Sequence, residues 1–136
     1  MLDLPPCVEQ AAEVYQLPVE IIQAIHTIEG GRQGQIVGPN RNGTYDMGPM
    51  QINTIWLPVL ASHGISKSDV LNDSCTNFAI GAWIYRQELN KFRDYELAAA
   101  AYNAGPSNLG AGRNYARKVM RVFRRLLSLR EAANDY

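Results

Sequence analysis

The stretch AIHTIEGG, residues 24–31, places an ionisable acid at the end of an apolar helical pattern. Glu29 lies four residues after Ile25, so the two share one face of a helix with a 3.6-residue period. Gly30 and Gly31 follow directly and are a common signal for the end of a helix. The apolar residues of this face are Ile21, Ile22, Ile25 and Ile28. The pattern predicts a helix that has Pro18 at its first position and ends in a carboxyl group beside the core.

Burial would suit Glu29 to proton transfer. Apolar surroundings favour the neutral acid and raise its pKa, and a carboxyl that stays protonated near neutral pH is what a general acid requires. The alternative is that Glu29 leans into solvent or accepts hydrogen bonds from Arg32. An acid in the last helical turn is also unfavourable against the helix dipole, so something local must compensate. These residues alone leave both interpretations open.

A second acid follows in the turn-rich stretch NRNGTYDMGPMQIN, residues 40–53. Asp46 comes 17 residues after Glu29, and two carboxyl groups are the components of glycoside hydrolysis. Two acids alone are weak evidence, and the composition around them is better evidence. Amide and hydroxyl groups for sugar recognition come from Gln51, Asn53, Asn40, Asn42 and Thr44, and aromatic faces from Tyr45, Trp56 and Tyr102. Each of these residues also has an ordinary use in turns or core packing.

The composition is that of one globular domain. The chain has 136 residues, of which 46% are apolar and 19% charged, and its formal net charge is zero. No global field therefore draws it to nucleic acid, and no apolar run is long enough to cross a bilayer. The first residues, MLDLPPC, have neither a basic nor an apolar region of the kind that a signal peptide needs.

The remaining segments predict a mostly α-helical fold of five or more helices around a small polar insertion. Pro5 and Pro6 suit the start of a first helix, and residues 32–51 are Gly/Asn-rich and predict irregular chain with a short hairpin. Ser66 with Asp69 resembles a capping box. The further expected helix starts are Asp73 or Ser74, Asp94, and about Asn114.

The two cysteines, Cys7 and Cys75, do not form a CxxC pair or a Cys/His cluster, so no metal site is predicted. Counting alone leaves open two buried free thiols or one disulfide. A disulfide across a 68-residue separation would be worth roughly 4 kcal/mol and would require an oxidising compartment. His26 and His63 have neither a metal-like nor a triad-like setting and are interpreted as incidental.

Three ordered motifs resemble a known family, the lysozyme-like soluble lytic transglycosylases. The resemblance is strongest to the small members that accompany secretion, conjugation and pilus systems. Glu29 matches the catalytic acid, GPMQIN matches a Gly-Leu-Met-Gln motif with Pro49 in place of Leu, and AYNAG, residues 101–105, matches a third motif in full. NYARKV resembles a late element of the family, with Ala116 in place of a Val. The resemblance extends from Cys7 to about Val122.

The resemblance implies a mainly α, lysozyme-like (α+β) fold over residues 1–136, in which a helical lobe and a small polar loop or β-hairpin flank a substrate cleft. Glu29 would protonate the bond between N-acetylmuramic acid and N-acetylglucosamine and then act as a base on the muramyl 6-hydroxyl, closing a 1,6-anhydro ring. Tyr102 would hydrogen-bond or orient Glu29. The expected substrate-binding residues are Gln51, Met50, Asn103, Tyr115, Thr44 and Tyr45. No cofactor or metal takes part in this chemistry.

The sequence departs from the family pattern at three places. Gly30 stands where many members have Ser, and the segment before the Met-Gln pair is a few residues longer. Asp46 makes GTYDMGPMQIN similar to the second-carboxylate segment of C-type lysozymes, in which that acid stabilises or attacks the sugar cation. The leading hypothesis is therefore a lytic transglycosylase, and the alternatives are a muramidase that uses Glu29 and Asp46 and a peptidoglycan-binding module without turnover.

A peptidoglycan substrate also implies an exported, periplasmic protein and, with it, a Cys7–Cys75 disulfide.

The last helix carries seven of the 13 basic residues: Arg113, Arg117, Lys118, Arg121, Arg124, Arg125 and Arg130. They predict either a solvated helical face or a docking surface for an envelope partner, an anionic membrane or an anionic wall polymer. The expected partners are thus peptidoglycan glycan strands and components of an envelope machine, with no nucleic acid. The chain is expected to be a monomer.

Overall fold

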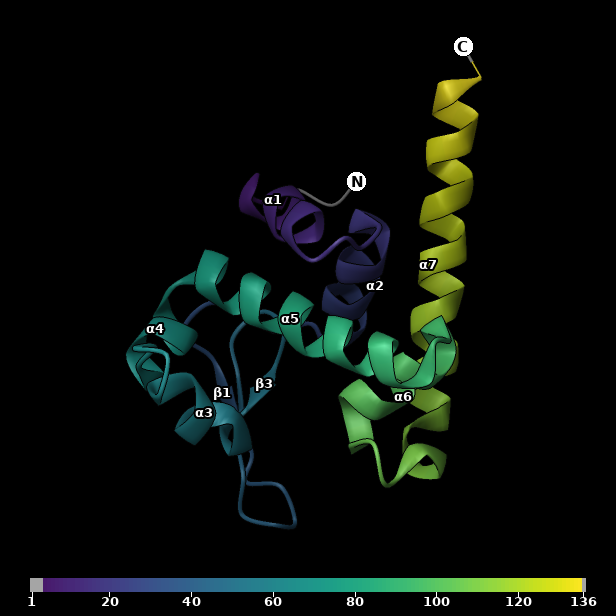
Figure 1. Cartoon of the computed structure of the whole chain (residues 1–136). Coiled ribbons are helices and arrows are strands. Elements are labelled where there is room, and N and C mark those ends of the chain that lie inside the picture. Colours follow the sequence, from purple (N-terminus) through teal and green to yellow (C-terminus); the bar gives the residue numbers. More distant parts are fainter. Residues whose placement is uncertain (1–3, 136) are drawn as a thin grey trace.

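Helices dominate residues 4–135, which are the residues that the computed structural model describes (Figure 1). The α-helices are α1 (Cys7–Val14), α2 (Val19–Glu29), α3 (Leu57–Ala61), α4 (Lys67–Asn72), α5 (Ser74–Phe92), α6 (Tyr95–Ala104) and α7 (Arg113–Asn134). Short 3-10 helices precede α3 and α7, namely η1 (Thr54–Trp56) and η2 (Leu109–Gly112). The strands are β1 (Ile36–Val37), β2 (Asp46–Met47) and β3 (Ile52–Asn53). The expected mainly α fold with a small β insertion is confirmed.

The insertion is a three-stranded antiparallel sheet, in the order β1-β2-β3. β2 pairs with both neighbours, so Asp46 is opposite Val37 on one side and Asn53 on the other. The sequence predicted a single hairpin in this region. A third strand is present because Gly48, at a φ of 71°, lets the chain turn back directly after Met47.

Side-chain caps set three of the predicted helix starts, those of α4, α5 and α6. Ser66 and Asp69 form the expected reciprocal capping box of α4, and Asp94 accepts a hydrogen bond from the Leu97 N–H at the start of α6. Asp73, not Ser74, caps α5. Pro18 precedes α2 as its N-cap instead of occupying the first helical position, because its ψ of 132° is extended.

The core lies where α2, α5, α6 and α7 meet. Figure 1 shows α5 crossing the molecule, the sheet and α3 below its first half, α6 below its second half, and α7 running alongside α2. Ile21, Ile22 and Ile25 of α2 are fully buried, as the isoleucine pattern predicted. The alanines 98–101 of α6 are also buried, and their small side chains let α6 pack closely on α5 and α7. The last turns of α7 extend beyond the rest of the fold (Figure 1).

Asn77 joins the helical part to the sheet. It is fully buried in α5, accepts a hydrogen bond from the Met50 N–H at 2.8 Å, and donates to the carbonyls of Met47 and Val70, both at 2.9 Å. Buried backbone groups need such partners, so Asn77 holds residues 47–50 in place. Gly48 lies against the same side chain, which a Cβ at that position would displace.

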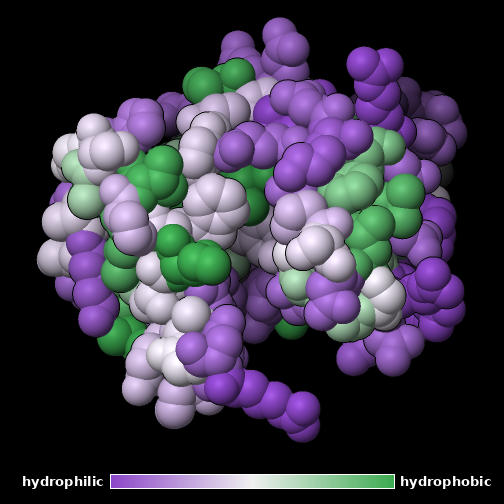
Figure 2. Space-filling model, turned by 60° about the horizontal axis from the view of Figure 1, so that its bottom comes forward, coloured by the Kyte–Doolittle hydropathy of each residue, from purple (hydrophilic) through white to green (hydrophobic). Residues whose placement is uncertain are grey.

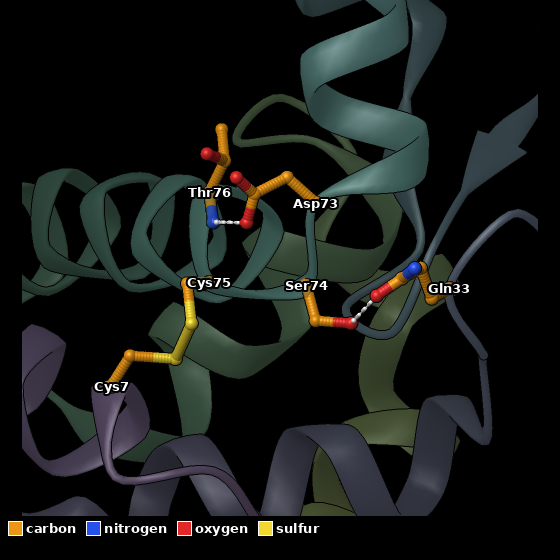
Figure 3. Close-up of a disulfide and its surroundings, with 6 residues drawn as sticks. All are labelled: Cys7, Gln33, Asp73, Ser74, Cys75 and Thr76. Carbon is orange, nitrogen blue, oxygen red and sulfur yellow. Dashed lines mark hydrogen bonds between the residues drawn. A yellow bond between two sulfur atoms is a disulfide. The ribbon is translucent and has the colours of Figure 1, made fainter.

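A disulfide joins Cys7, the first residue of α1, to Cys75 near the start of α5 (Figure 3). The two Cα atoms are 5.7 Å apart, which suits the bond. Next to it, the Ser74 hydroxyl donates to Gln33 at 2.8 Å and thereby ties the loop after α2 to α5 (Figure 3). The predicted pairing is confirmed, and it closes most of the chain between α1 and α5 into one covalent loop.

Between residues 4 and 135, no helix has both the length and the apolar character that crossing a membrane requires.

Candidate functional site

A cleft of about 330 Å³ opens between the sheet and α6, with α5 as its floor. Figure 2 shows the end of the molecule that carries it, hollowed between two lobes. The side of the sheet contributes Asn42, Asp46, Gln51, Ile52, Asn53, Ile55 and Trp56; the helical side contributes Glu29, Ile84, Glu88 and residues 101–106. The cleft therefore joins residues that lie far apart in the sequence, among them most of those predicted to act on a sugar.

Glu29 is the last residue of α2 and lines this cleft. Gly30 follows in the left-handed conformation, at a φ of 66°, and its N–H bonds to the His26 carbonyl, which ends the helix. Burial raises the pKa of Glu29 from 4.5 to about 7; approach of the Tyr115 hydroxyl lowers the value, and the negative charge of Asp46 raises it. Half or more of this acid is therefore protonated at or below neutral pH.

Tyr115, in the first turn of α7, lies close to the Glu29 carboxyl. Its hydroxyl lowers the pKa of Glu29. The same hydroxyl is buried and makes no hydrogen bond of standard geometry to any described residue. Burial first, and then the charge of Glu29, raise the pKa of Tyr115 well above its usual value, so its hydroxyl stays a donor. Tyr115 itself is not among the residues that line the cleft.

Asp46 reaches the cleft from β2 and is held by two amides. Asn40 Nδ2 donates to its Oδ2 at 3.2 Å, and Asn53 Nδ2 donates to its Oδ1 at 3.1 Å. Thr44 completes the network, since its hydroxyl accepts from both of these amides and donates to Asn42 at 2.6 Å. The turn residues predicted for sugar recognition thus serve first to orient Asp46.

The segment Gly48–Gln51 forms a tight turn on the cleft wall. Both the backbone N–H and the Nε2 of Gln51 donate to the Gly48 carbonyl, at 3.0 and 2.9 Å. Gln51 has a φ of 52°. Residues other than glycine rarely adopt this left-handed backbone conformation, and where they do it often marks a functional site. His26, which the sequence left without a role, ties α2 to this turn through Nδ1 and the Pro49 carbonyl at 2.9 Å. Because a carbonyl only accepts, Nδ1 carries the proton.

Tyr102 lines the cleft from α6, but it does not form the hydrogen bond to Glu29 that was one of its two expected roles. Its hydroxyl donates to the Met50 carbonyl at 2.7 Å. The hydroxyl has a single proton to donate, and the backbone carbonyl of Met50 in the Gly48–Gln51 turn accepts that hydrogen bond. Burial, followed by the charges of Glu29 and Asp46, raises the pKa of Tyr102 well above its usual value. Tyr102 therefore lies close to both acids and connects α6 to the sheet.

Four of the expected substrate-binding residues, Met50, Thr44, Tyr45 and Tyr115, do not line the cleft. The Met50 side chain is fully buried, because it fills the space that Gly81 of α5 leaves free. Thr44 belongs to the network around Asp46, and Tyr45 is 39% exposed outside the cleft. Gln51 and Asn103 line it as predicted. Trp56 also does, and its ring packs edge-on against Trp83 with centroids 5.5 Å apart.

Glu88, on the floor of the cleft, was missed at the sequence level. It is only 5% exposed, and its Oε2 is buried with no partner among the described residues. Burial raises its pKa, and Lys91 lowers it. In the sequence it stands among polar residues of YRQELNKF and resembled a solvated face. Its spacing of four residues from Ile84 was the available signal.

Within residues 4–135, no three His, Cys, Asp or Glu side chains come together in a way that would hold a metal ion.

Comparison with known proteins places these residues in a family context. The family model described as "Transglycosylase SLT domain" matches residues 6–121. The Invasion protein IagB of Salmonella typhimurium is 32% identical over 122 residues, which cover 88% of this chain and 76% of that protein. A Peptidoglycan-binding-like protein of Escherichia coli O157:H7 is 30% identical over 132 residues, covering 90% of this chain and 79% of that protein. Protein IpgF of Shigella flexneri is 31% identical over 101 residues, covering 74% and 66%.

Proposed function

We propose that this chain, which belongs to the Transglycosylase SLT domain family, is a lytic transglycosylase that cleaves the bond between N-acetylmuramic acid and N-acetylglucosamine in peptidoglycan. The observation that carries the proposal is Glu29, an acid with a pKa of about 7 that lines a cleft at a helix end. A pKa near the working pH suits a group that must first give a proton and then take one back.

The reaction uses Glu29 twice. Its carboxylic acid protonates the glycosidic oxygen as the bond from that oxygen to C1 of the muramyl residue breaks. The resulting carboxylate then accepts the proton of the muramyl 6-hydroxyl, whose oxygen bonds to C1 and closes the 1,6-anhydro ring. The proton leaves with the departing sugar hydroxyl, Glu29 is restored to its acid form, and no water is consumed.

Neighbouring groups position Glu29 for both steps. Burial keeps it protonated before cleavage, and the nearby Tyr115 hydroxyl stabilises the carboxylate afterwards. Tyr102 and His26 fix the Gly48–Gln51 turn, and with it Gln51, against the helices that carry Glu29 and Asn103. Gln51 and Asn103 are the polar side chains that we assign to the N-acetyl groups of the substrate.

A second candidate is a muramidase that hydrolyses the same bond, and Asp46 is the observation that favours it. Asp46 lines the cleft with Glu29, and its charge raises the Glu29 pKa, so the two carboxyl groups are close enough to interact. Two carboxyl groups flanking the bond are the arrangement of retaining hydrolases, in which the second acid stabilises or attacks the sugar cation.

Mass spectrometry of soluble muropeptides separates the two candidates. Digestion of purified cell wall by the native chain should release products lighter by one water than the hydrolysis products. Reducing-end muramic acid as the sole product would refute the transglycosylase and favour the muramidase. Glu29→Gln keeps the shape of the side chain and should lower either activity by about 10²–10⁴-fold. Intact wall binding without any release by the native chain would leave only a binding module.

The proposed substrate lies outside the cytoplasmic membrane, and the Cys7–Cys75 disulfide agrees with an oxidising compartment. We therefore propose a periplasmic protein that opens the wall locally for a secretion, conjugation or pilus machine. The names Invasion protein IagB and Peptidoglycan-binding-like protein, carried by relatives, agree with this setting.

The basic side chains of α7 are the proposed docking surface for that machine. All seven are exposed, and one of them, Arg130, pairs with Glu20 of α2 at 3.1 Å. Arg121 and Arg124 make no salt bridge among the described residues. Charge reversal at these two positions should change recruitment to the envelope and its salt dependence. Cleavage of soluble fragments should stay intact, and its loss would point to a folding defect instead.

A further inference from the structure

Glu88 is a third carboxyl group of the cleft, at a position that the proposed reaction does not use. It lies on α5, one turn after Ile84, and both line the floor. Ala101 of α6 and the turn at Gly105 and Pro106 line the same cleft. Glu88 therefore shares the cleft with these apolar groups while being only 5% exposed, and a buried acid is costly to keep.

The carboxyl group of Glu88 has no hydrogen-bond partner in the part of the chain that the structure describes. Its Oε2 is buried and accepts no hydrogen bond from residues 4–135. Lys91 is the one cation whose charge lowers the pKa of Glu88. Lys91 itself is exposed and forms no salt bridge in the described chain. A buried polar group in this condition calls for an unseen partner. Because Glu88 lines the cleft, that partner can be a bound molecule.

The surroundings indicate the chemistry of this partner. The residues that line the cleft include three carboxyl groups and no lysine or arginine, so an anionic group would be repelled. The last carbonyls of α6, which ends at Ala104, are further acceptors at this end. An ammonium group buried beside Glu88 would lose its hydration, which is costly for both ions. A neutral donor flanked by C–H groups suits this position best.

We propose that Glu88 is a glycan-positioning residue that accepts a hydrogen bond from a hydroxyl or amide N–H of an N-acetylhexosamine in the cleft. The inference rests on the proposed function, since it names a second contact of the same glycan strand. The apolar cleft residues Ile84, Ala101 and Pro106 would face the C–H side of that sugar ring. Glu88 takes no part in proton transfer at the bond being cleaved.

The test measures glycan affinity and stability together. Tri-N-acetylchitotriose is titrated into the full chain, with binding followed by calorimetry or by the fluorescence of Trp56, which lines the cleft. Glu88→Met removes the acceptor and the unpaired buried acid but keeps the volume. It should weaken binding about tenfold, the value of one hydrogen bond to a buried group, while raising the melting temperature. Glu88→Gln retains one acceptor oxygen and should weaken binding less than Glu88→Met.

Gln87→Met is the matched control. Gln87 is the preceding residue of α5, and it does not line the cleft. Its Nε2 is also buried without a hydrogen-bond partner among the described residues. This variant should raise the melting temperature and leave the affinity for the trisaccharide unchanged. Loss of affinity in both variants would mean that α5 as a whole was disturbed and would overturn the specific role of Glu88.

Each remaining outcome also decides. If Glu88→Met becomes more stable and binds as tightly as the native chain, Glu88 has no glycan role, even though the native chain cleaves wall. If Glu88→Met does not fold, Glu88→Ala is measured in its place, with the same weakening expected. A native chain that neither binds the trisaccharide nor releases muropeptides would overturn the proposed function, and this inference with it.

Discussion

Replacing Glu29 by Gln should stabilise the protein, and increasingly so as the pH rises. The folded chain raises the pKa of Glu29 from 4.5 to about 7, chiefly through burial. Between these two pH values the folded state binds a proton that the unfolded state has lost, so stability falls as the pH increases. Below pH 4.5 both states are protonated and the acid costs nothing. Above pH 7 the full cost of a buried carboxylate is present.

The magnitude follows from the two pKa values. One pKa unit corresponds to about 1.4 kcal/mol, so the interval from 4.5 to about 7 would amount to about 3 kcal/mol in a dry site. Glu29 is partly open to the cleft, and we therefore expect roughly 2 kcal/mol after solvent screening. For a chain of this size, that difference corresponds to a melting-temperature gap of roughly 7 °C.

Urea unfolding of the native chain and of Glu29→Gln, at pH values from 4 to 8 and with the disulfide intact, measures this difference. All other titrating groups are common to both proteins, so their effects cancel when the two unfolding free energies are subtracted. The gain of Glu29→Gln should be small at pH 4, grow through pH 5 and 6, and level off above pH 7. A difference that stays constant across this range would refute the reasoning, because Glu29 would then titrate alike in both states.

Three further predictions concern Asp46, Asn77 and the disulfide. Asp46→Asn should reduce wall cleavage by less than about tenfold, against about 10²–10⁴-fold for Glu29→Gln. Because the charge of Asp46 raises the Glu29 pKa, Asp46→Asn should also move the alkaline limb of the pH–rate profile to lower pH. Equal, complete losses in the two variants would favour the hydrolase. Asn77→Ala leaves three buried backbone groups unpaired and should cost at least about 3 kcal/mol in urea unfolding, whereas the exposed control Asn90→Ala should cost below about 1 kcal/mol. Cys75→Ser should lower the unfolding free energy by roughly 4 kcal/mol, and dithiothreitol should then have no further effect on its melting temperature; the same stability as the native chain would contradict the loop-closure argument.

Local sequence signals predicted much of the fold because they act over a few residues. The capping box of Ser66 and Asp69, the cap at Asp94 and the stop at Gly30 each involve contacts within one turn of chain, and all three are present. The third strand of the sheet was less visible, since strands of two residues have no periodicity to detect. Its position depends on Asn77, which comes 24 residues after Asn53 in the chain.

In the candidate site, too, the sequence predicted some features and left others to the tertiary structure. The isoleucine pattern and the following motifs were enough to single out Glu29, Asp46 and Gln51, because acids and amides stand out against apolar or turn-forming neighbours. The hydrogen bond of Tyr102 to Met50, the burial of the Met50 side chain under Gly81, and the role of His26 depend on contacts between elements that sequence spacing does not specify.

What the sequence determined by itself, then, is an acid placed by helical periodicity at the end of α2 and a set of motifs that names its family. Only the tertiary structure decided the surroundings that give this acid its chemistry. The pKa of Glu29 depends on how completely α7 and the sheet exclude water, and the unpartnered Glu88 became visible only when α5 formed the floor of the cleft. Both are consequences of desolvation, which is a property of packed elements and not of neighbouring residues in the chain.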